Sequence, residues 1–149
     1  MILKRLDDLE KARDIFQVSE IKFTTSGQRH LGAVIVSSDF KVKYVREKIE
    51  EWCEEVKKLS EFAKSQPYAE FTAYIHGKQH NYRYFLRTIR DISSCLQPLD
   101  DIITNTFIPS VMGFNTINTA ERELFSFPIK NGGMGIEILA DISDAEFGR

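Results

Sequence analysis

The chain has 149 residues, of which 42% are hydrophobic and 28% charged, and its formal net charge at pH 7 is −2. This composition is ordinary for a globular protein, and the length suffices for one packed core but not for two. A net charge near zero argues against a protein that coats polyanions with its whole surface. With no signal peptide and no apolar run near the ~20 residues that a membrane span needs, we expect an intracellular protein, cytoplasmic or nuclear, without a membrane partner.

The first part of the chain is expected to contain a small helix and a β-hairpin. Leucines and other apolar residues recur at helical spacing over residues 4–17, within a charged background. Residues 21–24 and 30–36 read as two strands joined by a turn at residues 25–28, Thr-Ser-Gly-Gln. Gly32, inside the second strand, indicates a bulge or a close approach of another backbone.

The rest of the chain predicts helices. A helix over residues 39–64 follows Ser37-Ser38-Asp39, and residues 68–89, 94–107 and 119–126 follow as further helices, with a final helix opening at residues 141–144. Pro109 is expected to close the third of these helices, and Thr119 to cap the fourth. The predicted fold is therefore mainly α (α+β), with an α/β-hairpin portion over residues 1–37 and a compact helical portion over residues 38–149.

A row of basic residues on the helix predicted over residues 68–89 and just beyond it is the most informative feature. The row consists of His76, His80, Arg83, Arg87 and Arg90. At about 100° per residue, the spacing of these five places them within an arc of roughly 80°. No Asp or Glu interrupts residues 71–90, and aromatic residues are interleaved. Arginine forks suit phosphate oxygens, and aromatic rings stack on sugars or bases. The pattern predicts polyanion contact, although a merely solvated helix face is the alternative. The predicted nucleic-acid-binding residues are His76, Lys78, His80, Arg83, Tyr84, Arg87 and Arg90.

Other residue patterns give no catalytic or metal site. His76 and His80 have the i, i+4 spacing of metal ligands, but Lys78 lies between them and would repel a cation. The two Leu-Asp-Asp strings, at residues 6–8 and 99–101, lie in helical patterns, where acids complement the helix dipole. Cys53 and Cys95 lack a metal-type spacing and are expected to be free thiols.

Several motifs occur in the order known from reverse transcriptases of LINE-like (non-LTR) retroelements. Residues 27–35, GQRHLGAVI, resemble the primer-grip hairpin that follows the palm of those enzymes. Residues 84–89, YFLRTI, and residues 99–109, ending in Phe-Ile-Pro, look like their helical thumb. Residues 124–128, LFSFP, with GGMGI at 132–136, are similar to a leucine–proline and GG-(L/M)-G-I segment beyond the thumb. The resemblance covers nearly the whole chain, although Val36 and Arg90 stand where Gly and Pro are expected.

This resemblance implies the end of the palm and the thumb of an RNA-directed DNA polymerase. The catalytic aspartates and their Mg²⁺ would belong to a palm N-terminal to Met1, so the resemblance implies neither catalysis nor a cofactor for this fragment alone. A thumb holds the template–primer duplex by its backbone. The implied partners are thus an RNA–DNA hybrid or other nucleic acid, bound regardless of sequence, and the missing fingers and palm. Arg29, His30, Leu31 and Gly32 would be primer-grip-like residues near the primer terminus.

A non-catalytic helical module for protein interaction or dimerisation is the alternative function. The helix over residues 39–64 carries an apolar seam with coiled-coil-like spacing, and Trp52 on that seam could anchor a partner.

Overall fold

The computed structural model describes residues 10–11, 14–15, 27–30, 33–36 and 38–147. Its contacts divide the chain into two compact units, residues 1–44 and 45–149, whereas the sequence predicted a division after residue 37. The helix predicted over residues 4–17 falls mostly outside the described residues. The four described positions within it, Glu10, Lys11, Asp14 and Ile15, are helical and exposed. The described chain is mainly helical, as predicted.

Two short strands, β1 (Gly27–His30) and β2 (Ala33–Val36), pair antiparallel, with His30 opposite Ala33. This is not the predicted hairpin. Gly27 and Gln28, expected in the turn, belong to β1, and the expected second strand is divided between β1 and β2. The expected first strand, at residues 21–24, and the primer-grip-like Leu31 and Gly32 lie outside the described residues. Short polar or glycine-containing strands such as β1, with the sequence GQRH, specify their register weakly, because they have no apolar face to bury.

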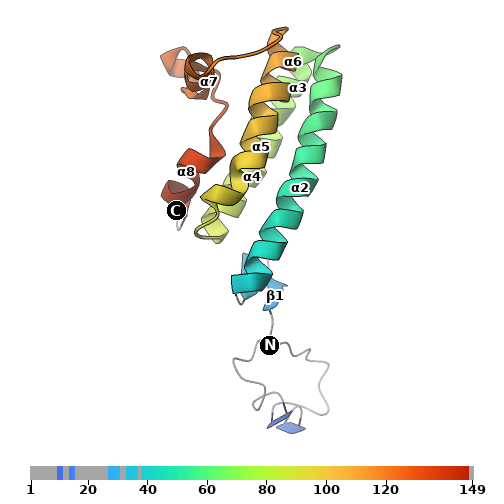
Figure 1. Cartoon of the computed structure of the whole chain (residues 1–149), viewed down its shortest axis with the longest axis vertical. Coiled ribbons are helices and arrows are strands. Elements are labelled where there is room, and N and C mark those ends of the chain that lie inside the picture. Colours follow the sequence, from blue (N-terminus) through green and yellow to red (C-terminus); the bar gives the residue numbers. More distant parts are fainter. Residues whose placement is uncertain (1–9, 12–13, 16–26, 31–32, 37, 148–149) are drawn as a thin grey trace. The chain divides into compact units, whose positions relative to one another are not determined.

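Residues 45–149 contain three helical rods that run side by side (Figure 1). The first is α2 (Ser38–Ala63), whose residues from Val45 onward belong to this unit. The second rod is α3 (Pro67–Ala73), the π-helical segment η1 (Tyr74–Lys78) and α4 (Gln79–Thr88). The third is α5 (Ser93–Ile102), the π-helical segment η2 (Ile103–Phe107) and α6 (Ile108–Met112).

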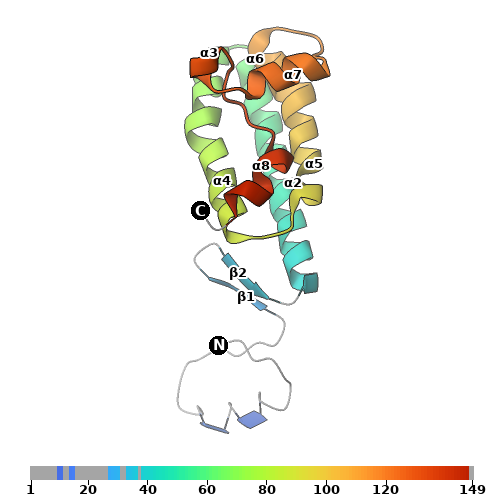
Figure 2. The same ribbon diagram turned by 90° about the vertical axis from the view of Figure 1, so that its left-hand side faces the viewer.

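Shorter elements complete the unit: α7 (Thr119–Ser126), the 3₁₀ turn η3 (Ile129–Asn131) and α8 (Leu139–Glu146). Helix α7 begins with a capping box in which Asn118, not the expected Thr119, is the N-cap and exchanges hydrogen bonds with Glu121. Helix α8 packs on both α4 and α5, and Figure 2 shows it lying across these two rods.

The core forms where the apolar stripes of the three rods meet. From α2 most of the predicted seam is buried, including Val45, Ile49, Trp52 and Val56. The Trp52 ring lies with its centroid 4.7 Å from that of Tyr82 and 4.9 Å from that of Phe85, both on α4. The Tyr74 ring of η1 lies 4.6 Å from that of Phe107 on η2. The aromatic rings therefore join all three rods.

One predicted helix boundary differs from the structure at a π-helical turn. Pro109 does not end the third rod, which continues to Met112. A proline is tolerated in the first turn of a helix, where its missing N–H has no intrahelical partner. The wider turn η2 ends just before α6, so Pro109 occupies such a first-turn position.

The connection between α7 and α8 packs closely on itself. Met134 and Ile136 donate their backbone N–H groups to the Phe125 carbonyl, and Gly135 donates to the Phe127 carbonyl. A Cβ atom on Gly133 would lie 2.1 Å from the Phe127 carbonyl oxygen, so only glycine fits there. The GGMGI motif is thus explained by backbone packing.

We expect that Tyr74→Phe stabilises the protein. The hydroxyl groups of Tyr74 and Tyr82 are buried without a hydrogen-bond partner among the described residues, and desolvating an unpaired hydroxyl is unfavourable. Removing the Tyr74 hydroxyl should raise the free energy of unfolding by about 1 kcal/mol in urea titrations. Tyr68→Phe, which removes the same hydroxyl from an exposed position, is the control. A loss of stability in Tyr74→Phe beyond the control would show that its hydroxyl is bonded.

Candidate nucleic-acid interface

The predicted basic row lies on the second rod, but with altered geometry. The π-helical segment η1 (Tyr74–Lys78) has i→i+5 hydrogen bonds and so holds an extra residue in its turn, which shifts His76 relative to the residues of α4. Helix α4 ends at Thr88, and Ile89 is already extended with φ −131° and ψ 122°. The prediction that Arg90 continues the helical row is therefore wrong, because the chain has turned away from the helix axis before it.

The two arginines on α4 are paired with carboxylates from the C-terminal segment. Arg83 forms a two-pronged ion pair with Glu137, its Nε donating to Oε2 at 2.7 Å and its Nη2 donating to Oε1. Arg87 donates from Nε to Glu146 Oε2 at 3.0 Å. The Arg87 side chain nevertheless keeps 44% of its surface exposed, against 9% for Glu146. Each guanidinium is thus oriented by a carboxylate that also neutralises part of its charge.

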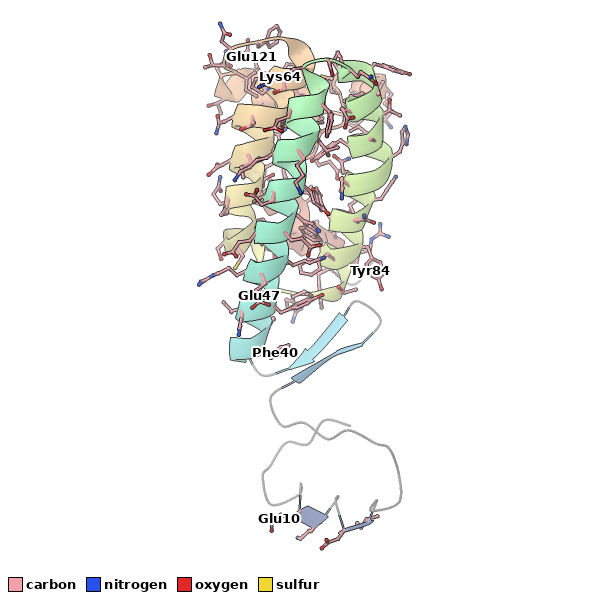
Figure 3. The ribbon with its side chains drawn as sticks, turned by 90° about the vertical axis from the view of Figure 1, so that its right-hand side faces the viewer. Glu10, Phe40, Glu47, Lys64, Tyr84 and Glu121 are labelled. Atoms are coloured by element: carbon pink, nitrogen blue, oxygen red, sulfur yellow. The ribbon has the colours of Figure 1, made fainter. Side chains whose placement is uncertain are left out.

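The remaining predicted cations and Tyr84 differ in their surroundings. Lys78 donates from Nζ to Glu55 on α2 at 2.7 Å. The Arg90 guanidinium lies 5.0 Å from the centroid of the Phe147 ring, a cation–π distance. Tyr84 is 54% exposed and projects from the outer side of α4 in Figure 3.

The two histidines of the row are exposed. His76 lies on η1 and His80 on the first turn of α4, and neither imidazole has a hydrogen-bond partner among the described residues. No group of three or more His, Cys, Asp or Glu side chains in the described part of the chain could hold a metal ion. Of the primer-grip-like residues, Arg29 and His30 lie on β1, opposite Val34 and Ala33.

Three side chains that the sequence analysis did not single out as site residues hold residues 135–140 in place. These residues include Glu137, which pairs with Arg83, and the start of α8, which carries Glu146. Gln79 donates to the Gly135 carbonyl and accepts from Glu137 N–H. Arg122, buried, donates to Thr104 Oγ1 and to the carbonyls of Ile136 and Glu137. Asp100 accepts from the N–H groups of Leu139 and Ala140, where α8 begins. The sequence does contain a sign of this role for Gln79 and Asp100: each is a polar residue on the apolar stripe of its helix, where a buried polar group needs a hydrogen-bond partner.

Burial shapes the chemistry of two of the groups that the sequence analysis weighed. Desolvation raises the pKa of the Asp100 carboxyl, and the two N–H donors of α8 oppose that shift. The first Asp of the second Leu-Asp-Asp string therefore caps a helix. Burial also raises the pKa of the Cys53 thiol, which keeps it in its less reactive protonated form. Cys53 and Cys95 both line a hollow of about 820 Å³ between α2 and α5, and both are free.

The alternative anchor, Trp52, is used inside the chain. Its side chain is 5% exposed and packs on Tyr82 and Phe85. The seam of α2 that suggested a dimer interface is largely core of this unit, so this part of the alternative is corrected by the structure.

None of the described helices is both long and apolar enough to cross a bilayer. Comparison with protein-family models, curated proteins and solved structures gave no match to this chain. The resemblance to reverse transcriptases thus rests on the order of the motifs, and the nucleic-acid interface stays a prediction.

We expect Arg122→Ala to destabilise the protein by about 2–4 kcal/mol, because it leaves the carbonyls of Ile136 and Glu137 without their donors. Urea titration gives the loss. Arg46→Ala, which removes the same charge from an exposed position on α2, should change stability by no more than about 0.5 kcal/mol. Equal effects of the two variants would contradict a locking role for Arg122.

Proposed function

We propose that this chain binds nucleic-acid duplexes by their sugar–phosphate backbones, without reading sequence, as a thumb-like segment of the kind that its motifs resemble. In this proposal the duplex is an RNA–DNA hybrid, and polymerisation would need fingers and a palm that carry the catalytic aspartates. The primer-grip-like residues, Arg29 to Gly32, would then lie near the primer terminus.

One observation carries the proposal: the rod η1–α4 exposes basic side chains along a stretch of sequence that contains no acidic residue. His76 and His80 are exposed, and Arg87 remains accessible although it is paired. A partly exposed guanidinium that uses one nitrogen for a carboxylate has other N–H groups to donate to a phosphate oxygen. Fixed in orientation by Glu137 and Glu146, the arginines lose less conformational entropy when they bind.

The ion pairs also limit how strongly the surface attracts a polyanion. Glu55, Glu137 and Glu146 each neutralise one cation of the predicted set: Lys78, Arg83 and Arg87. We therefore expect modest affinity that depends on two or three phosphate contacts. Each contact on a duplex contributes about −0.9 to the slope of log K against log salt, so the expected slope is about −2 to −3.

A salt titration of binding to a fluorescently labelled RNA–DNA hybrid tests the proposal. Arg83→Ala with Arg87→Ala should weaken binding by a similar factor for all sequences and make the slope shallower by about 2. Lys57→Ala with Lys58→Ala is the matched control, because it removes the same net charge from exposed positions on α2. A wild-type slope shallower than about −1, or equal losses in both double variants, would overturn the proposed surface.

Neutralising the carboxylates should have the opposite effect. In Glu137→Gln with Glu146→Gln the amide oxygens can still accept from Arg83 and Arg87, but two negative charges beside the surface are gone. We expect the affinity for the hybrid at low salt to rise about three- to tenfold, with a steeper salt dependence. Glu54→Gln with Glu61→Gln on α2 is the control for net charge. Weaker binding in the Glu137/Glu146 variant would instead assign these carboxylates to holding the arginines in their binding orientation.

A further inference from the structure

Gly77 stands out among the described glycines between residues 45 and 147, because the fold does not require it. A Cβ atom built on Gly77 meets no heavy atom within 4 Å, and the residue is not among the glycines with positive φ. The other described glycines of this unit have a reason in the fold. Gly113, Gly132 and Gly135 have φ values of 71°, 84° and 69°, and a Cβ on Gly133 would clash with the Phe127 carbonyl.

The position of Gly77 makes the absence of a side chain more unusual. It lies inside η1, in the middle of the second rod, where glycine favours the unfolded chain more than almost any other residue would. Alanine would give a more stable helix and would fit the available space. The local fold thus gives no account of a glycine here, whereas a surface that uses exposed helix backbone does.

The neighbours of Gly77 are polar. His76 precedes it, and His80 and Asn81 follow within about one turn, and all three are exposed. The imidazole and amide N–H groups can donate hydrogen bonds to phosphate oxygens. The same side chains can also accept hydrogen bonds from sugar hydroxyls. Between Tyr68 and Tyr84 no large hydrophobic side chain of the described rod is exposed.

We propose that the backbone of η1 at Gly77 is the point of closest approach of a nucleic-acid strand. The missing side chain lets a sugar edge reach van der Waals contact with the helix, while His76 and His80 bond the flanking phosphate and sugar oxygens. This proposal rests on the proposed function, and it moves the centre of the surface from the ion-paired arginines to the histidines and the glycine between them.

A protein helix could also approach a bare glycine closely. Such packing needs apolar side chains around the contact, because they supply most of the buried area. The exposed residues next to Gly77 on η1 and on the first turn of α4 are two histidines and an asparagine, and neither η1 nor α4 carries an acidic residue. These features favour the sugar–phosphate strand as the occupant.

The test compares Gly77→Ala and Gly77→Leu with the wild-type chain of 149 residues. Binding is measured as fluorescence anisotropy of a labelled RNA–DNA hybrid at low salt, and folding as the Tm. Gly77→Ala should raise the Tm by about 4 °C through its helix propensity, yet weaken binding about threefold. Gly77→Leu should stay folded and weaken binding more than tenfold. Ala120→Leu, at an exposed position on α7, adds comparable bulk elsewhere and should leave binding unchanged.

The outcomes separate this inference from the proposed function. If the wild-type chain binds and Gly77→Leu binds equally well, the contact at Gly77 is refuted while nucleic-acid binding stands. If the folded wild-type chain does not bind at low salt, both fail. If sedimentation instead shows self-association that Gly77→Leu abolishes, the face is a helix-packing surface and the inference is wrong.

Discussion

The unit formed by residues 45–149 depends on how the irregular connection between α7 and α8 satisfies its buried backbone groups. This segment has neither a strand partner nor helical hydrogen bonds over residues 134–138, and an unpaired buried N–H or carbonyl is unfavourable. The Phe125 and Phe127 carbonyls accept from three of its backbone N–H groups. Side chains supply the further partners: Gln79 from the second rod, Arg122 from α7 and, for the first N–H groups of α8, Asp100 from the third rod. Gln79 and Arg122 bond residues 135–137 and Asp100 bonds the start of α8, so these polar contacts attach the connection and α8 to the second and third rods.

This arrangement also decides what the basic face presents to solvent. Once the segment is held, Glu137 lies against Arg83, and α8 carries Glu146 to Arg87. The sequence separates these partners by 54 and 59 residues, so a local analysis of the acid-free stretch overestimates its charge. The electrostatic character of the candidate surface is therefore a tertiary property. What remains accessible is a mixed surface of exposed histidines and partly neutralised arginines, which suits a moderate interaction with a backbone better than tight capture of a polyanion.

Periodicity predicted the long helices well, because an apolar stripe such as Val45, Ile49, Trp52 and Val56 has one physical explanation. It could not predict the π-helical turns, of which η2 precedes the α6 helix that contains Pro109. Nor could it pair the strands, since residues 27–36 carry too little register information. The sequence predicted the basic residues on one helix, and all but Arg90 lie on one rod. The partners of its arginines and the use of Trp52 in the core depend on contacts between distant segments.

Glycines show how the residues that serve the fold can be told apart from those left to serve a partner. Gly132, Gly133 and Gly135 lie in the motif that resembles reverse transcriptases, and backbone conformation or close packing explains each of them. That motif therefore carries information about folding, and a chain could share it without sharing a ligand. Gly77 has no such explanation, and His76 and His80 beside it have no partner among the described residues. Residues that the fold does not account for, grouped on one exposed face, are where a binding function must be sought. The η1–α4 rod is therefore better defined as a candidate surface by Gly77 and its histidines than by the number of its cations.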